Sequence, residues 1–162
     1  MAATWMTSMT EFAPIILPVL NHINPKRIAE IGASAGGHSK LLCEFLRPRQ
    51  GQLFSIDPMP QQAFIDFAAQ NADVVHHIKQ PSLQGIDCVK TADVWFIDGD
   101  HNWYTVFNEL QQIETQAGEQ PYLLFLHDVG WPCARRDMYY NPQSIPAEYR
   151  KPYSAELGIT LD

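Results

Sequence analysis

The sequence predicts an α/β fold in which a doubly wound, mostly parallel sheet is covered by helices on both faces. Three observations lead to this prediction. Five short runs are apolar throughout, segments with helical spacing separate them, and most of the runs end at an acidic or histidine side chain. Uniformly apolar strands are typical of parallel sheets that are buried on both faces. A length of 162 residues fits a single domain with a substantial core.

The first 25 residues precede the predicted sheet, and we expect one or two helical pieces that end at Asn24-Pro25. The apolar run over residues 12–20 contains two prolines, and the first basic residues follow it, so the run resembles neither a signal peptide nor a membrane span. The three scattered cysteines indicate reduced thiols rather than a disulfide framework. We therefore expect a cytoplasmic protein that does not associate with a membrane.

Strands and helices then alternate along the chain. Strands are expected at residues 27–31, 52–57, 74–78, 93–98 and 122–126. Helices are expected at residues 39–46, 61–70, 82–91 and 104–115, where apolar side chains recur every three or four positions. Right-handed crossovers between parallel strands give a doubly wound sheet, whose ligands bind at the carboxyl ends of the strands.

Residues 129–162 differ in composition from the rest of the chain. They contain four prolines, and their aromatic residues are Trp131, Tyr139, Tyr140, Tyr149 and Tyr153. We expect an ordered loop with one helical turn near residues 146–150, which would form an acceptor wall. Arg135 and Arg136 would pair there with an anionic acceptor or, as an alternative, with surface acids such as Asp137. The domain thus divides into an N-terminal helical segment (1–25), a βα core (26–128) and this tail.

A glycine turn joins the first predicted strand to the next helix, with the sequence Glu30-Ile31-Gly32-Ala33-Ser34-Ala35-Gly36-Gly37. Glycines permit a tight turn and let a ligand approach without a Cβ in the way. The N-terminus of the following helix presents unpaired N–H groups, which suit a carboxylate or phosphate. The spacing matches neither the G-x-G-x-x-G of dinucleotide sites nor the Gly-Lys-Ser/Thr of phosphate loops.

At these residues the chain resembles the class I S-adenosylmethionine-dependent methyltransferases, whose first motif has the form acidic-x-Gly-x-x-x-Gly. The resemblance covers about residues 25–130 and includes Asp57, a second acid at the end of the next strand. It implies that S-adenosylmethionine lies with its methionine part against the turn and its ribose hydroxyls on Asp57. The loop at Ser82 would lie near the adenine, unless Ser82 serves as a helix cap. The candidate cofactor-binding residues are therefore Glu30, Gly32, Ala33, Gly36, Gly37, Asp57, Ser82 and Asp98.

Two further strand ends carry the sequences Asp98-Gly99-Asp100-His101 and His127-Asp128. Similar stretches occur in the O-methyltransferase branches related to macrocin and other sugar methyltransferases and to cephalosporin-hydroxylase-type proteins. The resemblance implies that acids after the fourth and fifth strands hold a divalent metal and that His101 is the base. Here His127 replaces an acid, so the candidate ligands are Asp98, His127 and Asp128. Magnesium, manganese, iron and zinc all stay open for such a set.

A structural role is the alternative for each of these acids: Asp98 would form hydrogen bonds at its strand end, and Asp100 would cap the next helix. If they are catalytic, a neutral His101 suits removal of a proton from a hydroxyl, with Asp98 assisting.

The expected function is transfer of a methyl group from S-adenosylmethionine to a hydroxyl of a small-molecule acceptor. A binding module without turnover and a dinucleotide-dependent oxidoreductase stay open as alternatives. The formal charge of −7 argues against a nucleic-acid partner. Methyltransferases of this class usually continue through two further strands, so the resemblance implies a domain that is shortened at its C-terminal end. A homo-oligomer would let a partner chain complete the acceptor site.

Overall fold

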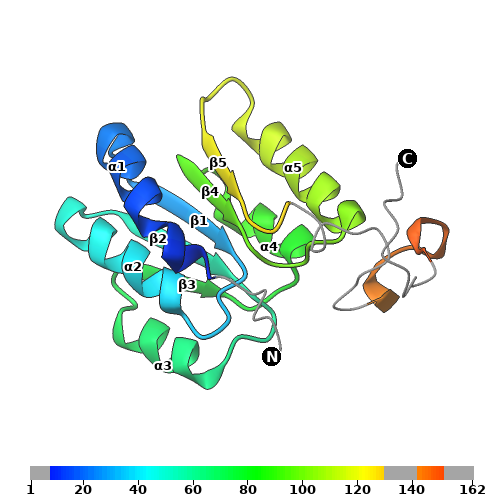
Figure 1. Cartoon of the computed structure of the whole chain (residues 1–162), viewed down its shortest axis with the longest axis horizontal. Coiled ribbons are helices and arrows are strands. Elements are labelled where there is room, and N and C mark those ends of the chain that lie inside the picture. The colour runs from blue at the N-terminus through cyan, green and yellow to red at the C-terminus, as the bar shows by residue number, and fades with distance from the viewer. Residues whose placement is uncertain (1–7, 130–141, 152–162) are drawn as a thin grey trace, which may run out of the picture.

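A sheet of five parallel strands forms the centre of the protein in the computed structural model, which describes residues 8–129 and 142–151 (Figure 1). The strands are β1 (Arg27–Ile31), β2 (Gln52–Ile56), β3 (Val75–Ile78), β4 (Val94–Ile97) and β5 (Leu123–Leu126). Their order in the sheet is β3-β2-β1-β4-β5. The chain therefore starts in the middle, runs to one edge and then crosses to the other side, which confirms the doubly wound prediction.

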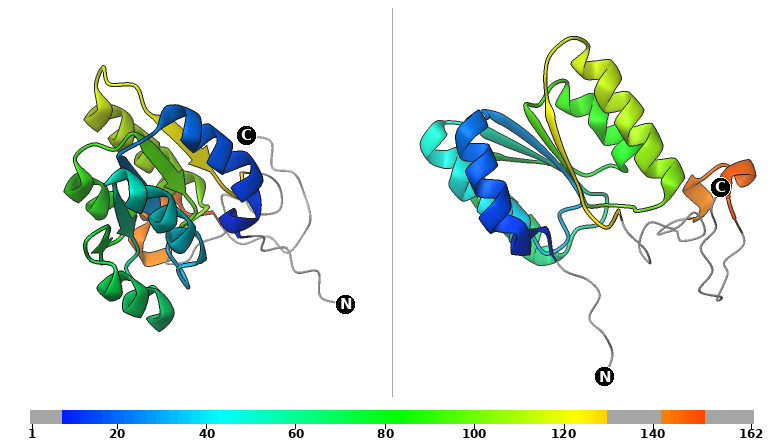
Figure 2. Two further views of the ribbon diagram at one scale, coloured as in Figure 1. Left: turned by 90° about the vertical axis from the view of Figure 1, so that its left-hand side faces the viewer. Right: turned by 45° about the horizontal axis from the view of Figure 1, so that its top comes forward.

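Helices cover both faces of this sheet (Figure 2). One layer contains α1 (Ala13–Ile23), α2 (Gly37–Leu46) and α3 (Gln62–Gln70), and the other contains α4 (Ser82–Val89) and α5 (Trp103–Ala117). Short 3-10 turns are η1 (Met9–Phe12), η2 (Arg47–Arg49), η3 (Pro142–Ser144) and η4 (Ala147–Tyr149). Within the described ranges, no helix has both the length and the apolar character needed to cross a bilayer.

Alternate side chains of each strand enter one of two apolar layers. Ile28, Leu53 and Phe96 belong to the layer that also contains apolar side chains of α1, α2 and α3, whereas Ile31 and Trp95 belong to the layer under α4 and α5. All five side chains are at most 2% exposed. Burial of a large apolar side chain stabilises the fold by about 1.5–3 kcal/mol, which explains why strands that are apolar on both faces occupy the sheet centre.

The strand order changes direction between β1 and β4, which are neighbours in the sheet although β2 and β3 separate them in the chain. A sheet of this type has its ligand crevice at the carboxyl ends of such strands. Gly32 directly follows β1 and has a φ of +90°, and a Cβ built on it would lie 2.2 Å from the carbonyl oxygen of Asp98. Only glycine permits this close approach of the two strand ends.

The residues that precede α4 and α5 are not the ones that the sequence suggested as their N-terminal caps. Helix α5 is capped by Asn102, whose Oδ1 accepts a 2.9 Å hydrogen bond from the N–H of Tyr104. Asp100 precedes this cap by two residues and accepts hydrogen bonds from the N–H of Asn102 and the hydroxyl of Thr105. Ser82 is the first residue inside α4, and Pro81 precedes it without a side-chain cap. Asp100 and Ser82 are therefore not the capping residues, because a cap must directly precede the first helical residue.

The tail is described only in part. Turn η4 lies in the predicted range 146–150, and the ring of its Tyr149 lies 4.9 Å from that of Tyr104 at the start of α5. The other aromatic residues proposed for the acceptor wall, and also Arg135 and Arg136, lie outside the described residues.

Candidate active site

The carboxylate of Asp57 lies directly against the glycine turn. Its Oδ2 accepts hydrogen bonds from the backbone N–H groups of Ala33 and Ser34 at 2.9 and 3.0 Å, and its Oδ1 accepts one from Met59 at 2.9 Å. Asp57 follows β2 and the turn follows β1, and these strands pair in parallel. The structure therefore brings together the turn and the second acid, the two features on which the cofactor hypothesis depends.

The rest of the turn is fixed by its own backbone. Gly36 has a φ of +83°, and its N–H donates to the carbonyl of Ala33 at 2.7 Å. A Cβ on Gly36 would lie 3.2 Å from the Phe64 ring, so the position tolerates little beyond glycine. Gly37 is the first residue of α2. Ala33 is 5% exposed and contributes its backbone rather than its side chain.

Glu30 is a buried residue of β1, next to the glycine turn. It is 1% exposed, and its Oε1 lies 2.8 Å from Nδ1 of His38. Its Oε2 accepts hydrogen bonds from the hydroxyls of Ser39 at 2.6 Å and Ser55 at 2.9 Å. Both oxygens are thus used by protein groups from α2 and β2. This geometry favours a role in holding β1, β2 and α2 together over the direct cofactor contact expected from the sequence.

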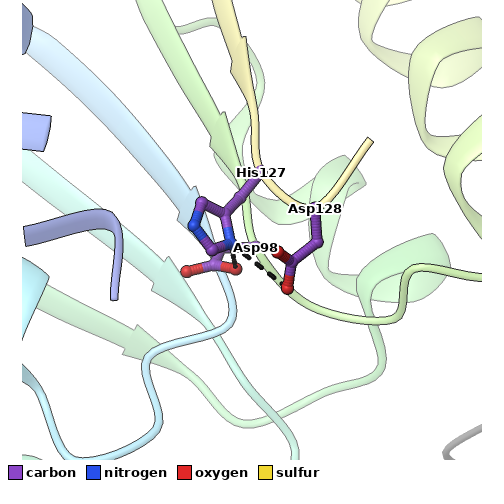
Figure 3. A group of neighbouring side chains, drawn as sticks. All are labelled: Asp98, His127 and Asp128. Atoms are coloured by element: carbon purple, nitrogen blue, oxygen red, sulfur yellow. Dashed lines mark ion pairs between the residues drawn. The ribbon is translucent and has the colours of Figure 1, made fainter. Parts of the chain in front are cut away.

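Three candidate metal ligands converge where β4 and β5 end (Figure 3). Nδ1 of His127 lies 2.9 Å from Oδ1 of Asp98 and 3.4 Å from Oδ2 of Asp128. Nε2 of His101 lies 3.5 Å from the same Asp128 oxygen. The His127 side chain is 6% exposed, while those of Asp98 and Asp128 are 25% and 19% exposed. The cluster is therefore partly open to a ligand.

The donor atoms of this cluster fit a divalent ion. Although Nδ1 of His127 is buried and close to both carboxylates, it meets neither at hydrogen-bonding geometry. Two donors that bind one ion at about 2.1 Å lie about 3.0 Å apart at right angles and about 3.4 Å apart at a tetrahedral angle. The two distances from Nδ1 are close to these values, and the three donor atoms all lie within 4.8 Å of one another. The spacing is therefore compatible with one shared ion.

The pKa of Asp98 is raised above its ordinary value, chiefly because the carboxyl is buried. The negative charge of Asp128 raises this pKa further. His127 and His101 oppose the rise because a positive imidazole stabilises the carboxylate, and His38 contributes in the same direction. A cation bound among these groups would also favour the ionised carboxylates.

Ser82 lies on the other side of the sheet, next to a buried acid. Glu109 of α5 is fully buried, and its pKa is raised to about 8, chiefly by burial and further by Asp100. The hydroxyl of Ser82 is near enough to lower this pKa, although neither Glu109 oxygen has a partner at hydrogen-bonding geometry among the described residues.

Sequence reasoning missed two residues. His38 pairs with Glu30, and Glu109 lies under the Ser82 loop. For His38, the only indication in the sequence was the pattern Gly-Gly-His-Ser at the start of a predicted helix, which follows a strand that contains an acid. Glu109 has an ordinary helical position, and nothing in the sequence distinguishes it from a surface glutamate.

The family described as Methyltransferase domain matches residues 29–129. No curated protein matches the sequence significantly. A Podospora anserina methyltransferase, PaMTH1, solved with S-adenosylhomocysteine bound, is 23% identical with a TM-score of 0.51, over 66% of this chain and 48% of that one. A Klebsiella pneumoniae protein classed as an O-methyltransferase is 21% identical with a TM-score of 0.51, over 68% and 53%.

A Staphylococcus aureus protein classed as a caffeoyl-CoA O-methyltransferase is 18% identical with a TM-score of 0.53, over 77% of this chain and 56% of that one. These likenesses show a shared fold. The matched region spans about half the length of each of these three solved proteins.

Proposed function

The chain belongs to the methyltransferase domain family, and from this premise we propose that it transfers a methyl group from S-adenosylmethionine to a hydroxyl of a small molecule. One observation carries the proposal: the Asp57 carboxylate is hydrogen-bonded to the glycine turn that follows β1, the strand at the switch point of the sheet. Its remaining acceptor position on Oδ1 can receive a ribose hydroxyl near the place where ligands of such sheets bind.

S-adenosylmethionine supplies an electrophilic methyl group on a positively charged sulfur. The protein's own part is to bind and orient the reactants. Asp57 is proposed to hold the ribose hydroxyls, and the turn at Gly32 to receive the methionine part without a Cβ in the way. The start of α4 at Ser82 is proposed to face the adenine. Such positioning accounts for much of the rate enhancement of two-substrate reactions.

His101 is proposed as the base that removes the acceptor's proton. Its Nε2 lies 3.5 Å from a carboxylate oxygen of Asp128, so the imidazolium formed after proton uptake would lie next to a negative charge. Asp98 lies within the same group of side chains and is the second proposed catalytic residue.

Asp98, His127 and Asp128 are proposed to hold a divalent ion, because their donor distances fit one coordination sphere. Such an ion would act as a Lewis acid, lowering the pKa of the acceptor's hydroxyl and fixing the position of that hydroxyl. The imidazole in the set extends the choice from magnesium to manganese, iron and zinc.

A second candidate is a module of the same fold that binds the cofactor without turnover. A dinucleotide-dependent oxidoreductase is the third candidate, and the turn lacks the middle glycine of its usual motif.

Calorimetric titration of the full chain with S-adenosylmethionine, S-adenosylhomocysteine and NAD separates these candidates. We expect binding of the first two and none of NAD; binding of NAD alone would overturn the proposal. Methyl transfer to catechol and to glucose, as probes of phenolic and sugar hydroxyls, then separates enzyme from binder. We expect turnover with one of these classes, its loss in Asp98→Ala, and a roughly 10²- to 10⁴-fold loss in His101→Gln. Cofactor binding without any turnover would favour the binding module.

We also propose that the protein is cytoplasmic and that its partner is a small-molecule acceptor, with no nucleic acid or membrane as a partner. The acidic balance of 11 Lys and Arg against 18 Asp and Glu argues against nucleic acid.

We further propose that a homo-oligomer completes the acceptor side of the site. Sedimentation equilibrium of the full chain tests this proposal, and a monomer with full activity would contradict it.

A further inference from the structure

His77 of β3 donates a hydrogen bond to the backbone of Asp57. Its Nε2 lies 3.0 Å from the Asp57 carbonyl oxygen, and because a carbonyl only accepts hydrogen bonds, Nε2 carries the hydrogen. The N–H of Asp57 donates in turn to the carbonyl of Ile78 at 3.1 Å. Strand β3 therefore holds both backbone polar groups of Asp57.

The register of the strands explains why a histidine meets this carbonyl. Strands β2 and β3 pair in parallel with Ser55 opposite His77, and Asp57 directly follows the end of β2. The side chain of His77 therefore reaches past the end of the neighbouring strand, toward the edge of the sheet where ligands bind. An imidazole combines this reach with a donor at its far end. An apolar side chain in the same place would leave the carbonyl without this bond.

The ring of His77 also packs against a residue that supports the other end of the glycine turn. It meets the ring of Phe64 at 88°, with 5.1 Å between the ring centroids. Phe64 is fully buried on α3, and a Cβ on Gly36 would lie 3.2 Å from its ring. Asp57 holds the start of the same turn through two backbone N–H groups. His77 thus contacts the two residues between which the turn is held.

The carboxylate of Asp57 needs an accurate orientation because protein and ligand share it. Oδ2 accepts two bonds from the turn, and Oδ1 accepts one from the N–H of Met59. The one acceptor position left on Oδ1 meets a ligand only if the backbone of Asp57 holds the side chain in place. A binding site must usually hold such a group within about 0.5 Å of its productive position.

We propose that His77 is a positioning residue that sets the affinity for S-adenosylmethionine by fixing the backbone of Asp57, an inference that rests on the proposed function. The hydrogen donated by Nε2 orients the peptide that follows Asp57. The packing on Phe64 holds the imidazole in the direction that this bond requires. His77 acts through Asp57 and not on the ligand.

Two substitutions separate the hydrogen bond from the ring packing. His77→Phe keeps an aromatic ring against Phe64 and removes the donor, whereas His77→Gln places an amide N–H near the position of Nε2 and removes the ring. Position 77 is only partly buried, so either side chain can be accommodated. His76→Phe is the matched control, because neighbouring side chains of a strand point to opposite faces and the His76 ring stacks on Phe54 at 5.0 Å.

Calorimetric titration of the full chain with S-adenosylmethionine tests the proposal. We expect His77→Phe to weaken binding roughly three- to tenfold, the effect of losing about one neutral hydrogen bond. His77→Gln and His76→Phe should stay within about twofold of the wild type. A structural role of the ring alone predicts the reverse order, with the glutamine variant weaker than the phenylalanine variant. That order, equal weakening by both substitutions, or full affinity in His77→Phe would overturn the proposal.

Failure of the wild type to bind S-adenosylmethionine would instead overturn the proposed function itself. Thermal unfolding of each variant accompanies the titrations. If His77→Phe does not fold, His77→Asn replaces it as the variant without a donor, because its shorter amide lies near the position of Nδ1 and does not reach the Asp57 carbonyl. A folded His77→Asn protein is expected to bind roughly three- to tenfold more weakly than His77→Gln. Equal affinity of these two amide variants would overturn the role of the donated hydrogen.

Discussion

Oδ2 of Asp57 accepts a 2.9 Å hydrogen bond from the backbone N–H of Ala33, which ties the end of β2 to the turn that follows β1. The same oxygen receives a second bond from Ser34. The other oxygen, Oδ1, accepts a bond from Met59. One carboxylate therefore has two roles: it fixes the shape of the turn, and its remaining acceptor position on Oδ1 is proposed to hold the ribose. Substitution tests the two roles, because asparagine keeps one acceptor oxygen for the turn and alanine keeps none.

Asp57→Asn keeps an acceptor oxygen for the turn but loses the charge and one acceptor position. The amide NH2 would then face the N–H of Met59, so we expect unfolding free energy to fall by about 1 kcal/mol. The affinity for S-adenosylmethionine should fall at least about tenfold, since a bond to a charged group contributes about 1.5–3 kcal/mol. Asp57→Ala, which also frees the turn N–H groups, should lose about 1–3 kcal/mol of stability. Urea unfolding and calorimetry measure the two effects. Unchanged affinity in both variants would contradict the ribose assignment.

Gly32→Ala is expected to damage the site through sterics. The added Cβ would lie 2.2 Å from the carbonyl oxygen of Asp98, and the backbone has a φ of +90° that side chains disfavour. We expect a loss of about 3 kcal/mol or more in unfolding free energy, because strain and overlap act together. Gly118→Ala is the control, since it also has a positive φ of +57° but nothing within 4 Å of its Cβ. It should cost about 1 kcal/mol. Equal losses in the two variants would show that the strand ends can separate freely.

The sheet was predictable because its strands are apolar on both faces. Val94, Trp95, Phe96 and Ile97 are all buried, so their sequence carries no alternation and indicates a central parallel strand directly. The partners of Glu30 were not predictable in this way. Its contact with Ser55 depends on the register in which β1 and β2 pair, and its contact with His38 depends on how α2 packs over that pair.

The candidate site also has features that the sequence predicts and features that depend on the three-dimensional packing. Asp57 and Asp98 were identified from their positions at strand ends, which the chain order alone fixes. Their proximity to particular backbone groups, and the convergence of Asp98 with His127 and Asp128, follow from three-dimensional register. Glu109 was missed because burial of a glutamate on a helix is set by the neighbouring helix, here α4, and not by its own sequence.

The imidazole at His127 should determine which ion the protein prefers. We expect the wild type to bind zinc and manganese more tightly than magnesium, because an imidazole suits these ions and a magnesium site prefers oxygen donors. His127→Asp supplies an all-oxygen set, so its affinity for zinc should fall at least about tenfold while that for magnesium holds or rises. Calorimetric titration of metal-free protein with each ion checks this.

His22→Asp on the exposed side of α1 is the control for that titration, since it makes the same change of side chain away from the cluster. It should leave all three affinities unchanged. Absence of binding of all three ions to the wild type would contradict the proposed metal site, and an equal effect of the two substitutions would show that net charge alone governs the affinities.

Glu109 is expected to make the protein less stable as the pH rises through neutrality. Its pKa is about 8 in the folded chain, against an ordinary value of 4.5, so the folded state binds the proton more tightly than the unfolded state does. Between these two values the folded protein holds about one more proton, and the free energy of unfolding falls by about 1.4 kcal/mol per pH unit from this group. Below about pH 4.5 the contribution is fully present, and above about pH 8 it is lost.

Glu109→Gln removes this dependence because an amide stays neutral at every pH. Urea unfolding of wild type and variant from pH 5 to pH 9 should therefore show that the free energy of unfolding of the variant increases relative to that of the wild type as the pH rises. Above about pH 8 the difference should be constant. Glu114→Gln, on a surface-exposed position of the same helix, controls for the loss of one charge and should run parallel to the wild type. If the two glutamine variants show the same pH profile, Glu109 is ionised in the folded protein at neutral pH, and the acid beneath the Ser82 loop carries a charge rather than a proton.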